Sequence, residues 1–263
     1  MSVLVESTEL LLIFAVVFAG GLVTGVTGFG FAIVATASLA SLFEPQTAVV
    51  IVIIPILAAN VSLVRDLDRQ GLAACARRFW SFVAAAAVGT VGGMLALSAI
   101  PAAPLVLALG LFTLSYVAVE QPWVRLPGEA WVGEFCMVET HVRKGLLGVA
   151  SGAVFGVSNV GVQVIAYLES LELDHRTFVG VVAMIFLGVG VVRVVAAWLL
   201  GLYGSTALVG VSVAAAVPGL VGVALGKRFR GRIDPRTRDA VVYLLLAVIG
   251  TKLAVDGAGV LLR

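Results

Sequence analysis

Thirty-four consecutive residues, Leu10 to Phe43, carry no charged side chain, and three glycines interrupt them in the stretch GVTGFG from Gly25 to Gly30. A single helix of that length would measure about 51 Å at 1.5 Å per residue, which exceeds the roughly 30 Å of a bilayer's hydrocarbon core. The whole chain is similarly apolar, because 61% of its residues are hydrophobic and only 12% are charged, about half the charged share of a soluble domain. We therefore predict an integral membrane protein whose first apolar segment is broken at these glycines.

Charges and prolines divide the 263 residues into eight apolar segments. All should be helical, since lipid cannot satisfy the backbone of an open sheet, so the predicted fold class is an all-α polytopic membrane protein. The segments are Leu10–Phe43, Pro45–Val64, Phe79–Ser98, Pro104–Val119, Gly145–Leu168, Phe178–Leu200, Thr206–Gly226 and Ala240–Leu261. The polar insert between the fourth and fifth predicts either a short amphipathic helix on the membrane surface or a plain linker.

The glycine stretch recurs later in the chain. GVTGFG returns as GVSNVG from Gly156 to Gly161, at a sequence offset of 131. We interpret this as a duplication into repeat 1 (1–119) and repeat 2 (144–263), joined by a cytoplasmic connector (120–143), with four apolar segments in each repeat. The glycines, taken by themselves, could instead form a face of small residues against which another helix packs closely. Two further matches at an offset of 130 support the duplication: Glu44–Thr47 with Asp174–Thr177, and Gly89 and Gly92 with Gly219 and Gly222.

The distribution of Lys and Arg predicts the orientation of the repeats, because basic loops stay on the cytoplasmic side. If Gly145–Leu168 crossed the membrane once, the loops on its two sides would carry eight and seven basic residues. If this segment instead enters and returns as a hairpin, fourteen basic residues fall on one side and only Arg263 on the other. We therefore predict a re-entrant or discontinuous helix followed by three transmembrane helices in each repeat. The repeats are then inverted, the N-terminus lies outside and loops 65–78 and 227–238 are cytoplasmic, as in alternating-access transporters.

The two breaks predict an anion-binding site. Backbone that unwinds within the membrane must line a protein cavity, and two half-helix N-termini that meet near the midplane attract an anion. Groups at the breaks would bind it, although the polar side chains among them could instead cap their own half-helices. The candidates are Thr27, Gly28 and Gly30 at the first break, and Ser158, Asn159, Gly161 and Gln163 at the second.

Three polar residues elsewhere in the apolar segments complete the candidate substrate-binding set. Arg193 either binds the anion or snorkels to the membrane surface. Lys252 either binds the anion or pairs with Asp256 four residues on. Asn60 either contributes to the site or makes an interhelical hydrogen bond.

The sequence gives little support for a buried proton relay, a hydrolase, a disulfide or a metal site. Both histidines, and every Asp and Glu except Asp256, lie in loops or at segment ends. We therefore expect no buried proton relay, so any coupling to protons would act through the substrate or a terminal carboxylate. An intramembrane hydrolase built around Ser151 would lack a base within reach. The isolated Cys75 and Cys136 suggest neither a disulfide nor a metal site. We expect no catalytic residue, cofactor or nucleic-acid partner.

Three stretches carry a resemblance to a known family: GGLVTGVTGFGFAIVATASLASLFEPQTAVV, GLLGVASGAVFGVSNVGVQVIAYLESLELDHRTFVGVV and VPGLVGVALGKRF. In these motifs and their order, the chain resembles the sulfite exporter TauE/SafE family over nearly its whole length. The resemblance implies a secondary transporter of small organosulfur anions, such as sulfite, sulfoacetate or related sulfonates, in the prokaryotic plasma membrane. The family's glycine-rich turn falls on Gly25–Gly30 and Gly156–Gly161, where Phe29, Asn159 and Val160 replace the usual glycines and leave the substrate open. A passive anion channel of the same architecture is the alternative.

Overall fold

The computed structural model describes residues 7–65, 69–119, 141–159, 161, 164, 168, 175–230 and 235–262. Within these residues all regular secondary structure is α-helical, as the sequence predicts. The helices are α1 (Ser7–Thr27), α2 (Phe31–Ala40), α3 (Pro45–Val64), α4 (Arg69–Ala99), α5 (Ala102–Val119), α7 (His141–Ser158), α9 (His175–Leu199), α10 (Thr206–Phe229) and α11 (Pro235–Leu261). The predicted connector, 120–143, lies outside the described residues except for the start of α7.

In the part of the chain that the structure describes, six helices are long and apolar enough to cross a membrane. Their spans are Ser7–Thr27, Pro45–Val64, Arg77–Ala99, Thr177–Leu199, Thr206–Phe229 and Tyr243–Leu261. Large apolar side chains on these helices, including Val88, Trp198 and Val248, face outward and are exposed, which suits contact with lipid tails rather than water. The chain is therefore a polytopic membrane protein.

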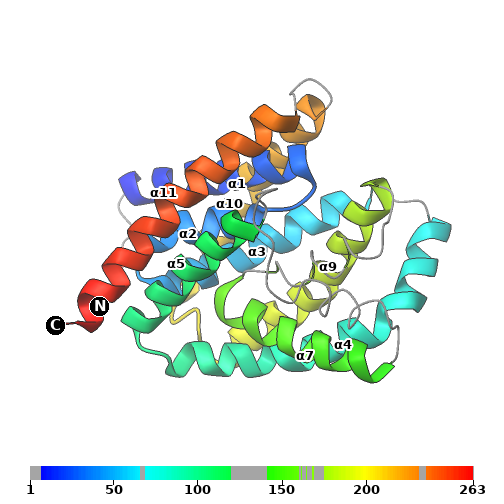
Figure 1. Cartoon of the computed structure of the whole chain (residues 1–263), viewed down its shortest axis with the longest axis horizontal. Coiled ribbons are helices and arrows are strands. Elements are labelled where there is room, and N and C mark those ends of the chain that lie inside the picture. Colours follow the sequence, from blue (N-terminus) through cyan, green and yellow to red (C-terminus); the bar gives the residue numbers. More distant parts are fainter. Residues whose placement is uncertain are drawn as a thin grey trace.

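The helices surround α3 and α9, whose apolar spans are the most buried of the six. Figure 1 shows α3 running through the middle of the molecule, with α1, α10 and α11 to one side and α4 and α7 to the other. One continuous apolar core connects these layers, and α3 contributes Val49, Ile51, Val52 and Ile56 to it. The centre of the molecule is thus built from the helices that follow the two breaks.

The first break is a reversal of the chain. Gly28 and Gly30 have φ angles of 96° and 97°, a region in which a side chain would be strained. After this turn α2 folds back along α1, so that Gly20 faces Ala35 and Gly30 faces Val23. The 21 residues of α1 make about 31 Å of helix before the reversal. The first break therefore follows a helix of span length.

Glycines bring α1 against α10, and α7 against α4, at backbone contact distance. A Cβ added at any of eight positions would overlap a carbonyl oxygen of the facing helix. Between α1 and α10 the contacts are Gly21 to Gly219, Gly25 to Val223, Gly222 to Phe18 and Gly226 to Leu22. Between α7 and α4 they are Gly152 to Ala86, Gly156 to Thr90, Gly89 to Val149 and Gly93 to Ala153. In each pair the residue numbers rise together, so the paired helices run parallel.

The two sets of contacts correspond one to one, but not at the offset that the sequence match gave. Each contact residue of α1 lies 131 positions before its counterpart in α7. Each contact residue of α4 lies 133 positions before its counterpart in α10. Gly89 therefore corresponds to Gly222 and Gly93 to Gly226, whereas a Cβ at Gly92 would meet nothing within 4 Å. The match of Gly89 and Gly92 with Gly219 and Gly222 was thus three residues out of register, because spacing alone cannot distinguish a glycine that packs from one that faces outward.

Candidate functional site

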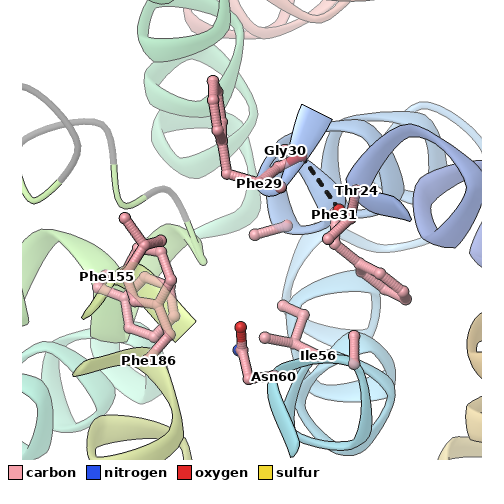
Figure 2. Close-up of a pocket in the computed structure, with 12 residues that line it drawn as sticks. Thr24, Phe29, Gly30, Phe31, Ile56, Asn60, Phe155 and Phe186 are labelled. Atoms are coloured by element: carbon pink, nitrogen blue, oxygen red, sulfur yellow. Dashed lines mark hydrogen bonds between the residues drawn. The ribbon is translucent and has the colours of Figure 1, made fainter. Parts of the chain in front are cut away.

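A small cavity lies where the first break meets α3, α7 and α9 (Figure 2). The break contributes Gly28 through Ala32, α3 contributes Ile56, Ala59 and Asn60, and aromatic rings from α7 and α9 form the opposite side. The cavity volume is about 30 Å³, enough for one or two water molecules. A larger ligand would require these walls to move apart.

The start of α2 borders this cavity. Phe31 and Ala32, the first residues of the helix, line it, and the N-cap Gly30 offers no side-chain hydrogen bond to the first turn. The first amides of any helix lack intrahelical acceptors, and they carry the positive end of the helix dipole. The cavity is therefore adjacent to uncapped donors that favour an anion.

Asn60 approaches the cavity from the opposite wall. Its side chain extends from α3 into the space between the break and the aromatic rings (Figure 2). The residue is only 6% exposed, and its amide makes no hydrogen bond to the residues described here. Its amide therefore faces the cavity with donor and acceptor groups available to a polar ligand.

The hydroxyl groups of the two breaks are used locally. Thr27 Oγ1 lies 2.9 Å from the Val23 carbonyl oxygen, and it accepts a hydrogen bond from the Phe29 amide at 3.2 Å. Ser158 Oγ donates to the Val154 carbonyl at 2.7 Å. In both breaks the hydroxyl therefore bonds its own helix, which is the capping arrangement that the sequence offered as the alternative.

Asn159 connects the second break to helices of the first half. It is the one non-glycine residue with a positive φ angle, 62°, in the described ranges. Its Nδ2 donates to Thr36 Oγ1 on α2 at 2.8 Å and to the Val49 carbonyl on α3 at 3.0 Å. The side chain is fully buried, and its Oδ1 lacks a partner. Next to it, a Cβ at Gly161 would overlap the ring of Phe186; Gln163 lies outside the described residues.

The two charged candidates lie in different surroundings. Arg193 is 1% exposed, and its guanidinium carbon lies 4.8 Å from the ring centre of Phe155, so its side chain does not snorkel out of the fold. Lys252 is exposed, and its Nζ donates to the Ser41 carbonyl at 2.6 Å, at the C-terminal end of α2. Arg193 therefore lies behind one cavity wall, whereas Lys252 does not line the cavity.

Aromatic side chains form much of the cavity wall, and the sequence did not predict them as binding residues. Phe29 and Phe31 flank the break, while Phe155 and Phe186 stack with ring centres 4.9 Å apart and planes at 12°. Phenylalanine is common in any membrane helix, so only Phe29, inside the glycine stretch, had a distinguishing position. The structure thus unites Gly28, Gly30 and Asn60 at one cavity with rings that no sequence pattern singled out.

Comparison with known families decides what kind of protein carries this cavity. The sequence model of the family described as sulfite exporter TauE/SafE matches residues 12–253. The chain belongs to the TauE/SafE family. Searches of curated proteins and of solved structures found no match. This TauE/SafE protein is therefore a multi-pass membrane transporter of sulfite-type anions, since members of the family are transporters rather than enzymes.

Proposed function

We propose that this protein is a secondary carrier in the prokaryotic plasma membrane that moves small organosulfur anions, such as sulfite or sulfoacetate, and binds them in the central cavity. The observation that carries the proposal is the pairing of the uncapped start of α2 with the unbonded amide of Asn60 across one small cavity. An oxyanion between them would receive backbone N–H donors from one side and an amide N–H from the other.

The position of the cavity supports alternating access. Thr24 and Phe155 are related by a sequence offset of 131, and Ile56 and Phe186 by an offset of 130, so equivalent positions of the two repeats line the same cavity. A cavity on the axis that relates two repeats is where rocking of one repeat against the other exposes a site to either side in turn.

The arrangement of α5 and α11 supports inversion of the repeats. Gly110 of α5 faces Ala254 of α11, and Gly257 of α11 faces Leu107 of α5. Residue numbers on the two helices therefore run in opposite directions. These helices end repeat 1 and repeat 2 respectively, and equivalent helices that run antiparallel are expected of inverted repeats.

The size of the cavity favours a carrier over a channel. A volume of about 30 Å³ accommodates one or two waters, whereas a channel conducts through a continuous hydrated path. A carrier opens such a site to one side at a time. The extracellular N-terminus and cytoplasmic basic loops that the positive-inside rule predicts belong to the same proposal.

Transport of radiolabelled sulfite into proteoliposomes tests this function, with sulfoacetate as competitor. We expect saturable uptake and counterflow, in which unlabelled sulfite inside the vesicles accelerates entry of the label. Protein-free liposomes and liposomes with an unrelated membrane protein are the controls. Flux that rises linearly with concentration and shows no counterflow would contradict a carrier and favour a channel. Flux of neither anion would contradict the substrate class.

A further inference from the structure

Arg193 is a buried cation with two nitrogen atoms whose donors are not used. Among the described residues it is the one charged side chain that is buried. Its Nε and Nη2 atoms have no hydrogen-bond acceptor, and no carboxylate in the described part of the chain lies within ion-pair distance. A guanidinium removed from water without a counter-charge costs several kcal/mol, so its retention in a membrane span needs an explanation.

A second donor without a partner accompanies it. Tyr203, in the loop between α9 and α10, is 6% exposed, and its hydroxyl has no hydrogen-bond partner. Tyr203 belongs to the same buried cluster as Ala196 and Ala197, which lie one helical turn after Arg193 on the same face of α9, and Ser212 of α10 lies beside its hydroxyl. Ser212 Oγ donates its one proton to the Ile51 carbonyl at 2.7 Å, so toward the phenol it can act only as a neutral acceptor. Tyr203 and Arg193 therefore offer several N–H and O–H donors and no acceptor with a negative charge.

Phe155 separates this cluster from the central cavity. The Phe155 ring contacts the Arg193 guanidinium, and it also stacks on the ring of Phe186. Both rings also line the cavity. The Phe155 ring therefore lies between the Arg193 guanidinium and the cavity. The cation–π contact with Phe155 offsets part of the cost of burying Arg193.

We propose that Arg193 and Tyr203 form a second anion-binding station, which the transported anion occupies when the Phe155–Phe186 stack separates. The proposal rests on the proposed function, and it assigns the second station to an oxyanion with three oxygens, such as sulfite or a sulfonate group. Two oxygens accept from Nε and Nη2 in the bidentate geometry of guanidinium, and the third accepts from the phenol. The anion supplies the counter-charge that the protein lacks.

Equilibrium binding of radiolabelled sulfite to purified protein in detergent tests the station separately from transport. Because charge-assisted hydrogen bonds are the strong ones, we expect Arg193→Gln to weaken binding roughly tenfold or more and Arg193→Lys to retain part of the affinity. Arg78→Gln is the matched control: Arg78 also stacks on a phenylalanine, with 5.5 Å between its guanidinium carbon and the Phe79 ring centre, but at an exposed position. We expect it to bind sulfite as the wild type does.

The melting temperature distinguishes an anion site from a structural arginine. Since an uncompensated buried charge destabilises a fold, Arg193→Met should melt at or above the wild-type temperature in sulfite-free buffer and should lose the rise that sulfite gives the wild type. A lower melting temperature together with an intact rise on adding sulfite would overturn the inference.

The binding outcomes separate this inference from the proposed function. Sulfite binding that Arg193→Gln leaves unchanged would overturn the second station alone. Binding of sulfate or phosphate only, lost in Arg193→Gln, would overturn the substrate class alone. Wild-type protein that binds none of sulfite, sulfoacetate, sulfate and phosphate would overturn both.

Discussion

The two breaks of this protein share one backbone feature and differ in the side chains beside it. Gly28 and Asn159, which correspond at a sequence offset of 131, both have positive φ angles, 96° and 62°. The residue before each is a hydroxyl residue whose oxygen lies close to the carbonyl four residues earlier, Val23 for Thr27 and Val154 for Ser158. The two breaks therefore share a positive φ at this position, although only the first uses glycine to adopt it.

The difference lies in what occupies the space beside each turn. At the first break the missing side chain of Gly28 leaves room for Val179 of α9, in apolar contact. At the second, Asn159 fills the space and donates to the carbonyl of Val49, which is the counterpart of Val179 at an offset of 130. The first break also has hydrogen bonds, but they lie within the turn itself, where the hydroxyls of Thr24 and Thr27 donate to the Phe29 carbonyl. The hydrogen bonds of Asn159 instead tie the second break to α2 and α3, so the second break is fixed to its neighbours, whereas the first can shift as a unit around a ligand.

The cavity follows the same asymmetry. On the side of the first break, its walls include Thr24 and Ile56, while the equivalent positions in the second half hold the stacked rings of Phe155 and Phe186. At these two pairs of positions the side chains are smaller beside the first break than beside the second, although Phe29 and Phe31 also line the cavity there. Substrate binding should therefore depend on the first break and fold stability on the second.

The largest expected effect concerns the helix interfaces that hold both breaks. Gly89→Ala and Gly222→Ala each place a Cβ against a facing carbonyl oxygen, and forcing the helices apart should lower the free energy of unfolding by about 3 kcal/mol. Equilibrium unfolding in mixed micelles measures this. Gly92→Ala, which meets nothing within 4 Å, is the control and should be neutral. Equal effects at Gly89 and Gly92 would contradict the structural register.

A smaller loss is expected when the second break loses its hydrogen bonds. Asn159→Ala leaves the Val49 carbonyl and the Thr36 hydroxyl without their donor and keeps a Cβ at positive φ. We expect about 2 kcal/mol of destabilisation in the same unfolding assay. Asn159→Gly relieves the backbone strain and should recover part of it. Wild-type stability in both variants would show that Asn159 does not fix the break.

The smallest effect should follow from making the first break resemble the second. Gly28→Asn brings a side chain into the space of Val179, at a cost of about 1 kcal/mol, and it should slow sulfite counterflow because the turn loses its freedom to adapt. Val179→Ala provides the space and should recover the part of the loss that comes from overlap, while the strain of a side chain at a φ of 96° remains. An additive loss in the double variant would argue against contact between the two side chains.

The sequence predicted the helices and the first break because these depend on local properties. Absence of charge, Pro45 at the start of α3 and the Gly28 and Gly30 pair determine where helices begin and end without reference to the rest of the chain. The surroundings of Asn60 and Arg193 depend on packing between distant helices, so the sequence could name both residues but could not place Asn60 in the cavity or Arg193 behind Phe155. The three-residue error in matching Gly92 to Gly222 has the same origin.

The central claim is that the anion binds beside Asn60 and the start of α2, and a charge substitution tests it most directly. We would measure sulfite counterflow for Asn60→Asp and Asn60→Gln in proteoliposomes at neutral pH. An ionised carboxylate in the cavity would repel the substrate, whereas glutamine keeps the amide. The account predicts that Asn60→Asp abolishes counterflow while Asn60→Gln retains a measurable part of it. Wild-type counterflow in a correctly folded Asn60→Asp variant would contradict the account.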